Sequence, residues 1–134
     1  MSIAETGTLP VTTEQHVVSA RQLVRQLAQL CGFSLVDQTK LVTAASELAR
    51  NTVKYGGGGE MNWQIRREGI RCGVRLQFVD EGPGIPDLEQ AMTDGWTSGA
   101  GLGMGLSGAK RLVNDFEIET AEGRGTRVSV TRWK

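Results

Sequence analysis

The feature that most constrains this chain is a run of four glycines at alternate positions: Gly99, Gly101, Gly103 and Gly105. Glycine loses more backbone entropy on folding than any other residue and has no side chain to bury, so the run cannot belong to a packed helix or strand. It suits a loop whose bare N–H groups approach a ligand closely, and phosphate is the ligand that such groups favour. A helical pattern begins at Leu106, and an acidic glycine turn, Asp80–Gly84, lies upstream. Together these features indicate a nucleotide site.

Length and charge limit what the chain can do. It has 134 residues, about the length of one ordinary domain, and we expect a single domain over residues 1–134. Its 15 basic and 15 acidic residues give a formal net charge of zero, so nothing suggests a nucleic-acid partner. No apolar run approaches the ~20 residues of a membrane span, and no export signal is visible. The sequence therefore predicts a cytoplasmic protein in which Cys31 and Cys72 are reduced thiols of the core.

Hydrophobic periodicity predicts the order of helices and strands. Apolar residues recur at helical spacing over residues 16–31, 35–55 and 104–114. Alternation predicts a short edge strand and four further strands, over residues 9–15, 61–65, 72–78, 116–120 and 126–130. Strands with one buried face, grouped with helices, predict an α/β fold. We expect a two-layer sandwich in which a mixed, mostly antiparallel sheet carries the helices on one face.

The helix predicted over residues 35–55 carries two polar residues suited to chemistry. Glu47 and Asn51 are four residues apart, so they share one helical face. A carboxylate can take a proton from an attacking hydroxyl, and an amide oxygen can complete the oxygen shell of Mg²⁺. Taken alone, the pair fits an exposed polar stripe better, but the glycine motifs favour the chemical interpretation. The tetraglycine that ends this helix, Gly56–Gly59, is interpreted as a flexible turn.

A second candidate group follows the strand predicted over residues 72–78. Asp80 keeps the buried parity of that strand, and a buried carboxylate needs a partner. The exocyclic amine of adenine is a donor that it can accept. Gly82 and Gly84 would let the chain turn tightly against a flat base, and Thr126 could reach the same base directly or through a water. The alternatives are a turn aspartate that bonds its own backbone and an ordinary strand threonine.

Other nucleotide-binding motifs are absent or incomplete. The chain has no GxxxxGK[ST], which excludes a P-loop. The stretch Gly103–Gly108 matches GxGxxG, but it follows a loop and leaves no room downstream for a Rossmann unit. HRD and DFG are both missing, so the chain is not a eukaryotic-type protein kinase.

Four short boxes, in the right order, resemble those of the GHKL ATPase superfamily, which includes gyrase, Hsp90, histidine kinases and MutL. Glu47–Asn51 resembles its N-box and Asp80–Gly84 its DxGxG box. Gly101–Leu106 resembles its second glycine box and Gly125–Thr126 its terminal GT. One box alone would be weak evidence, whereas the ordered set is specific. The superfamily has the Bergerat ATP-binding fold, in agreement with the expected two-layer sandwich.

Within the superfamily the chain is most similar to RsbT-type serine/threonine kinases of bacterial partner switching, from about residue 10 to the end. The resemblance implies Glu47 as general base and Asn51 as Mg²⁺ ligand. It also implies a set of ATP contacts: Asn51, Lys54, Asp80, Gly82, Gly84, Ile85, Gly101, Leu102, Gly103, Met104, Gly105, Leu106 and Thr126. Residues 87–100 have no clear period and contain two glycines, and we expect them to form a lid over ATP.

The resemblance implies an ATP-dependent kinase of a serine or threonine on a STAS-domain antagonist or scaffold protein, in a stressosome-like pathway. It further implies activation of a PP2C-type phosphatase by binding. The alternative is a nucleotide-binding sequestration module, such as an anti-sigma factor, with little kinase activity. The intact pair of Glu47 and Asn51 favours the kinase, because a pure binding protein does not need Glu47. A histidine kinase is disfavoured because the single histidine, His16, begins a helix with no acidic residue after it.

Overall fold

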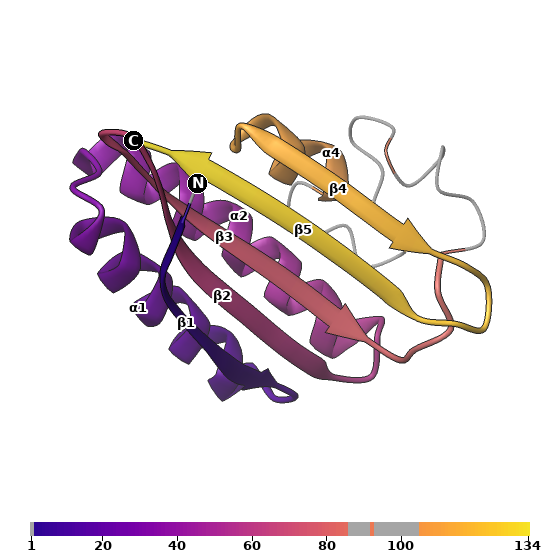
Figure 1. Ribbon diagram of the computed structural model, residues 1–134. Coiled ribbons are helices and arrows are strands. Elements are labelled where there is room, and N and C mark those ends of the chain that lie inside the picture. Colours follow the sequence, from indigo (N-terminus) through magenta and orange to yellow (C-terminus); the bar gives the residue numbers. More distant parts are fainter. Residues whose placement is uncertain (1, 86–91, 93–104) are drawn as a thin grey trace.

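The chain forms a five-stranded sheet with helices on one face (Figure 1). The computed structural model describes residues 2–85, 92 and 105–134. The strands are β1 (Ser2–Val11), β2 (Gly59–Glu68), β3 (Arg71–Asp80), β4 (Asp115–Thr120) and β5 (Thr126–Trp133). They lie in the order β1-β2-β3-β5-β4, and each neighbouring pair in the described sheet is antiparallel. The predicted two-layer sandwich with a mostly antiparallel sheet is confirmed.

Alternation of side chains along the strands explains why the sheet has one covered and one open face. In β3, Val74, Leu76 and Phe78 are almost fully buried, while the residues between them point away from the helices. The open face is polar at its centre. There a chain of hydrogen bonds crosses the strands: Thr8 Oγ1 donates to Asn62, Asn62 to Gln77, and Gln77 to Ser129. The sheet therefore has the two-sided character expected of an antiparallel sheet that packs on one side only.

Three helices are described: α1 (Glu14–Leu30), α2 (Leu35–Lys54) and α4 (Gly105–Arg111). The Thr13 side chain caps α1 and the Ser34 side chain caps α2, each accepting a hydrogen bond from a backbone N–H of the first turn. Gly32 follows α1 with a φ of +78°, as expected for a glycine that ends a helix. None of the helices in the described part of the chain has the length and apolar character needed to cross a membrane.

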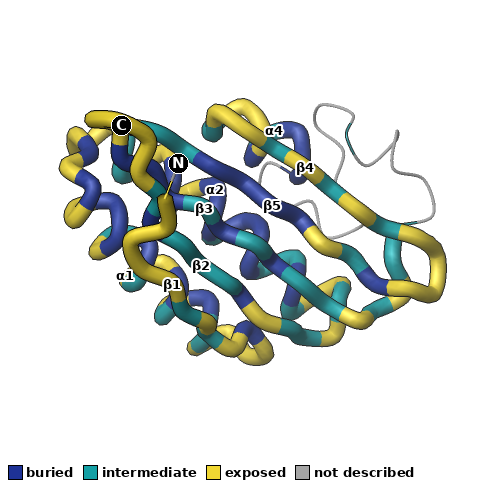
Figure 2. The backbone as a smooth tube through the Cα atoms, viewed as in Figure 1, coloured by how far each residue is buried: buried dark blue, intermediate teal, exposed yellow. Residues whose placement is uncertain are grey.

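Helix α2 is the central element of the helical layer (Figures 1 and 2). From Leu41 onward its apolar residues are buried and pack against the sheet and α1: Leu41, Val42, Ala44, Ala45, Leu48 and Ala49. The small alanines let the helix approach its neighbours closely. Because this stripe faces the core, the position of every other residue of α2 around the helix axis is set by it.

Two expectations from the sequence are corrected by the structure. The edge strand begins at Ser2, not at residue 9, because β1 pairs along the whole length of β2, and the following helix begins at Glu14. Cys31 and Cys72 are not reduced thiols but form a disulfide, and their Cα atoms are 5.4 Å apart. The disulfide joins the end of α1 to the start of β3 and links two residues that are 41 positions apart in the sequence. Spacing along the chain could not reveal this pairing.

The packing of α2 predicts a large loss of stability when its apolar stripe is shortened. Leu41 is 0% exposed, so Leu41→Ala should lower the free energy of unfolding by about 2–5 kcal/mol, the range seen when a buried leucine leaves a cavity. Urea denaturation followed by circular dichroism measures it. Ile70 is 102% exposed, and Ile70→Ala should change stability by less than about 0.5 kcal/mol. Equal losses for the two variants would contradict the described core.

Candidate functional site

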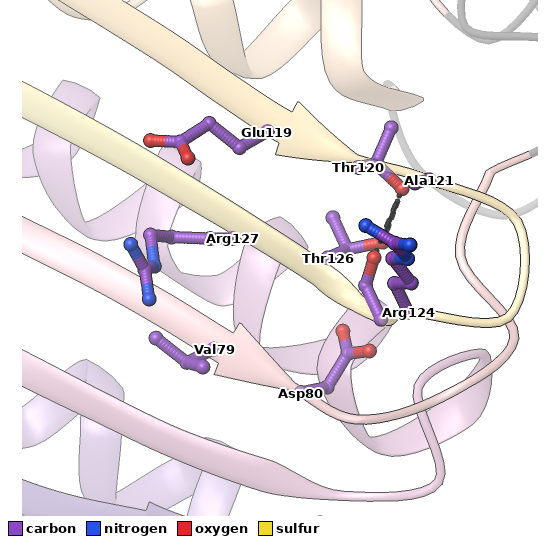
Figure 3. Close-up of a pocket in the computed structure, with 9 residues that line it drawn as sticks. Val79, Asp80, Glu119, Thr120, Ala121, Arg124, Thr126 and Arg127 are labelled. Carbon is purple, nitrogen blue, oxygen red and sulfur yellow. Dashed lines mark hydrogen bonds between the residues drawn. The ribbon is translucent and has the colours of Figure 1, made fainter.

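Three polar residues lie side by side where β3, β5 and β4 meet at one end of the sheet. Asp80 is paired with Thr126, and Thr126 with Thr120, so the three side chains form a row across neighbouring strands. The row borders a cavity of about 320 Å³ (Figure 3). Glu119, Arg124 and Arg127 also line this cavity. Its volume lies at the lower end of the range typical of small-ligand sites.

Asp80 is held at the end of β3 with limited access to water. Its Oδ1 accepts a hydrogen bond of 3.0 Å from the backbone N–H of Gly82. Burial raises the pKa of the Asp80 carboxyl above its ordinary value of 3.8, although backbone N–H groups of Gly82 and Thr126 act in the opposite direction. The fold thus keeps a carboxylate where its charged form is disfavoured, which is typical of a group retained for binding.

Thr120 connects the row to the loop that follows Asp80. Its Oγ1 accepts a 2.9 Å hydrogen bond from the backbone N–H of Ile85. The same oxygen lies 3.1 Å from the carbonyl oxygen of Gly125 and 2.9 Å from Thr126 Oγ1 (Figure 3). These contacts fix the predicted site residues Ile85 and Thr126 relative to each other.

Several glycines stand where backbone segments touch. A Cβ on Gly84 or Gly125 would collide with backbone carbonyl oxygens, and both residues have a positive φ, of +78° and +80°. A Cβ on Gly82 would lie 2.7 Å from the Cα of Gly56. A Cβ on Gly56 would in turn collide with the carboxyl of Asp80. The tetraglycine forms a turn as expected, and in addition its first residue, Gly56, lies directly against the carboxyl of Asp80.

Glu47 is buried in the middle of α2, with 4% of its surface exposed. Its Oε1 accepts a 3.0 Å hydrogen bond from the backbone N–H of Gly105, the first residue of α4. Its Oε2 accepts from Arg50 at 3.4 Å, and Arg50 also donates to Ser46. A carboxylate has about four lone-pair positions, so further acceptor capacity is left. Glu47 thus connects α2 with the segment that carries the glycine run.

The other predicted residues of α2 occupy the end of the helix nearest to Asp80. Asn51 is partly buried one turn after Glu47. Lys54 is exposed, and its Nζ lies 5.6 Å from the centre of the Tyr55 ring. Gly56 then brings the chain against Asp80. Gly56, which follows α2, therefore lies against the end of β3, while the residues that line the cavity come from β3, β4, β5 and the turn between β4 and β5.

Part of the predicted site lies outside the described residues. Gly101, Leu102, Gly103 and Met104 are among these, as is the predicted lid over residues 87–100 apart from Met92. Of the glycine run, Gly105 is described: it is buried and has a φ of +68°. Leu106, the next residue, is 6% exposed and belongs to the core. Their predicted contacts with ATP stay predictions.

Sequence reasoning missed three residues that the structure brings to the site. Gly56 was hidden in the tetraglycine, although its place directly after the helix of Glu47 was a usable signal. Arg50 lies three residues after Glu47, a spacing at which side chains of a helix meet. Thr120 gave no signal, because a threonine in a strand is common and its partners depend on the register of β4 against β5.

The donor set of the site does not resemble a protein cage for a metal. Among the described residues, no group of three or more histidine, cysteine, aspartate or glutamate side chains could hold a metal ion. Asn51 supplies one amide oxygen on the same helical face as Glu47. Such a set fits Mg²⁺, which usually keeps several waters and shares its ligands with substrate phosphates.

Known proteins are similar to this chain over most of its length. Residues 36–134 match the family described as histidine kinase-, DNA gyrase B-, and HSP90-like ATPase. The chain is 41% identical, over 92% of each chain, to the serine/threonine-protein kinase RsbT of Bacillus subtilis (strain 168). It is 32% identical to the anti-sigma F factor of Clostridium novyi (strain NT), over 88% of this chain and 86% of that one. A solved structure of RsbU and RsbW domains from Mycobacterium tuberculosis shares the fold, with a TM-score of 0.65 at 21% identity, over 96% of this chain and 32% of that one.

The raised pKa of Asp80 predicts that this residue lowers the stability of the fold. Between the ordinary pKa of 3.8 and the higher pKa in the folded state, the folded protein binds more protons than the unfolded chain. The free energy of unfolding therefore falls as pH rises through this window. Asp80→Asn, which keeps the acceptor for Gly82, should be more stable than the parent at neutral pH. The difference should vanish below pH 3.8.

Urea denaturation of both proteins at neutral and at acidic pH checks this prediction. An Asp80→Asn protein that is less stable than the parent at neutral pH would contradict the inferred burial of the charge.

Proposed function

The chain belongs to the family of histidine kinase-, DNA gyrase B- and HSP90-like ATPases, and on this premise we propose that it phosphorylates a serine or threonine hydroxyl of a STAS-domain antagonist or scaffold protein. It is a homologue of the serine/threonine-protein kinase RsbT, and its enzymatic class is that of an ATP-dependent protein kinase. The proposal treats residues 1–134 as one kinase domain that works in the cytoplasm, where ATP and a protein substrate are both available.

The observation that carries the proposal is the placement of Glu47. This carboxylate is 4% exposed, and it is fixed by Gly105 on one side and Arg50 on the other. A general base must lie within hydrogen-bond reach of the proton that it removes, and its effect depends on that positioning. We assign to Glu47 the removal of the proton from the attacking hydroxyl, with its remaining lone pairs as the acceptors.

The row of Asp80 and Thr126 supplies the proposed base pocket. The Asp80 carboxylate is an acceptor for the exocyclic amine of adenine, and the cavity beside it has room for a planar base. Gly84 and Gly125 bring bare backbone close to the same place. The phosphates would then extend toward α2 and the glycine run, where the resemblance places Gly101, Gly103 and Gly105.

Asn51 would hold Mg²⁺ by its amide oxygen. When bound, Mg²⁺ neutralises charge that develops on the phosphates during transfer. Lys54 lies one turn further along the helix, where its exposed ammonium can approach the phosphates of ATP. Asn51 and Lys54 lie on the same face of α2 as Glu47. One helix would therefore orient both the phosphates of ATP and the general base, Glu47.

The proposed partners follow from the relatives. The relatives include a serine/threonine-protein kinase and anti-sigma F factors, and both names refer to protein targets. We propose a STAS-domain protein as the substrate and a PP2C-type phosphatase as a second partner that the kinase activates by binding. No nucleic-acid partner is proposed, in agreement with the formal net charge of zero.

A second candidate function is sequestration of a partner protein with little kinase activity. The 32% identity to an anti-sigma F factor favours it. So does the hydrogen bonding of Glu47, because a carboxylate that anchors Gly105 could be kept for structure alone. The two candidates differ in one measurable property, which is the transfer of phosphate to a partner.

Glu47→Gln separates binding of ATP from transfer of phosphate. The amide can still accept from the Gly105 N–H, so ATP affinity should stay nearly unchanged. Transfer should fall by roughly 10²- to 10⁴-fold, the usual contribution of a positioned general base. The measurements are calorimetry with ATP and transfer of labelled phosphate to a STAS-domain partner. Glu117→Gln, an exposed change on β4, is the matched control and should behave as the parent.

Full transfer by the Glu47→Gln protein would remove Glu47 from the mechanism. A parent protein that binds its STAS partner tightly but transfers no phosphate would favour the sequestration candidate instead.

Asn51→Ala should have a different effect. Because the proposed metal ligand also orients the phosphates, its loss should weaken ATP binding and reduce transfer together. ATP calorimetry with and without Mg²⁺ measures this, and the parent should bind more tightly with Mg²⁺. If the parent and Asn51→Ala show the same dependence on Mg²⁺, Asn51 is not a ligand of the metal.

A further inference from the structure

Thr120 has more hydrogen-bond partners than its place in an edge strand requires. Its single hydroxyl lies within hydrogen-bond distance of the Ile85 N–H at 2.9 Å, the Gly125 carbonyl at 3.1 Å and Thr126 Oγ1 at 2.9 Å. The three partners come from the loop after β3, the turn before β5 and β5 itself. The hydroxyl also borders the cavity beside Asp80 (Figure 3).

Counting protons fixes the direction of these hydrogen bonds. A threonine hydroxyl has one proton and two lone pairs. The Ile85 N–H can only donate, so it occupies one lone pair of Thr120. The Gly125 carbonyl can only accept, so it takes the Thr120 proton. The second lone pair of Thr120 is then filled by the proton of Thr126.

The consequence concerns what Thr126 can offer to a ligand. With its proton directed at Thr120, the Thr126 hydroxyl turns only lone pairs toward the cavity. Asp80 is its neighbour in the row, and an ionised carboxylate is also an acceptor only. Two adjacent acceptors match an amino group, which has two N–H donors. They do not match a carbonyl oxygen, which brings a third set of lone pairs.

We propose that Thr120 is a positioning residue for base selection, which holds Thr126 as an acceptor so that the site takes a 6-aminopurine nucleotide and rejects a 6-oxopurine. The inference rests on the proposed ATP site and adds to it the residue that sets its selectivity. Thr120 need not touch the base. It acts by accepting the hydrogen bond of the Thr126 hydroxyl, so that Thr126 has no proton left to donate to a 6-oxo group.

The test compares two nucleotides that differ at the 6-position, ATP and inosine triphosphate, by calorimetry. The parent should prefer ATP. Thr120→Val keeps the β-branched shape but frees the Thr126 proton, so the preference for ATP should fall by about twofold to tenfold, the value of one hydrogen bond. A general loosening of the loop at Ile85 would lower the affinities for ATP and inosine triphosphate equally and leave the ratio of the two affinities unchanged.

Two further variants make the outcome decisive. Thr120→Ser keeps the hydroxyl and should restore the ratio of the parent. Thr8→Val removes a strand hydroxyl that donates to Asn62, away from the cavity, and should leave the ratio unchanged. A parent that binds neither nucleotide would refute the proposed ATP site itself. If the parent binds ATP and the Thr120→Val protein prefers ATP over inosine triphosphate as strongly as the parent or more strongly, only the role of Thr120 is refuted.

Discussion

The site depends on the apolar contact between α2 and the sheet. Between Leu41 and Thr52, buried residues recur three and four positions apart along α2. The strands beneath the helix present Met61, Leu76 and Phe78 at 2% exposure or less. This contact fixes both the depth of the helix and its rotation about its own axis. The packing of the apolar neighbours therefore sets the direction in which Glu47 and Asn51 leave the helix. Without that packing, two polar residues on a helix would specify no geometry.

Backbone approach, more than side-chain contact, closes the site around Asp80. Gly82 touches Gly56, Gly84 touches the turn after β4, and Gly125 touches the backbone of Asp80 itself. Each contact excludes a Cβ, so the glycines bring α2, β3 and β5 closer than side chains would permit. The hydrogen bond from the Gly123 N–H to the carbonyl oxygen of Pro83, at 2.6 Å, adds to this closure. The short row of Asp80, Thr126 and Thr120 is therefore bordered closely by backbone on several sides.

Periodicity predicted the helices, four of the five strands and the one-sided sheet, because the pattern of buried residues repeats over short stretches of sequence. It misplaced the edge strand β1. It also placed Glu47 and Asn51 on one face of a helix. Features that depend on register or on chain crossings were not predictable in this way. The Cys31–Cys72 disulfide and the role of Gly56 each require knowing which distant segments meet. Thr120 is the clearest case, because its three partners are set by strand register and two turns.

The strand β3 connects two ends of the molecule that differ in construction. At its start, Cys72 is linked to α1, and the guanidinium of Arg71 lies 4.7 Å from the centre of the Trp133 ring. At its end, eight residues and roughly 26 Å further on, Asp80 meets turns and glycines. β3 is paired with β2 along its whole length and with β5 from Gly73 to Asp80, so it is a central strand of the sheet. The two ends of β3 are therefore held differently, by a covalent and an aromatic contact at Cys72 and Arg71 and by turns and close backbone contacts at Asp80.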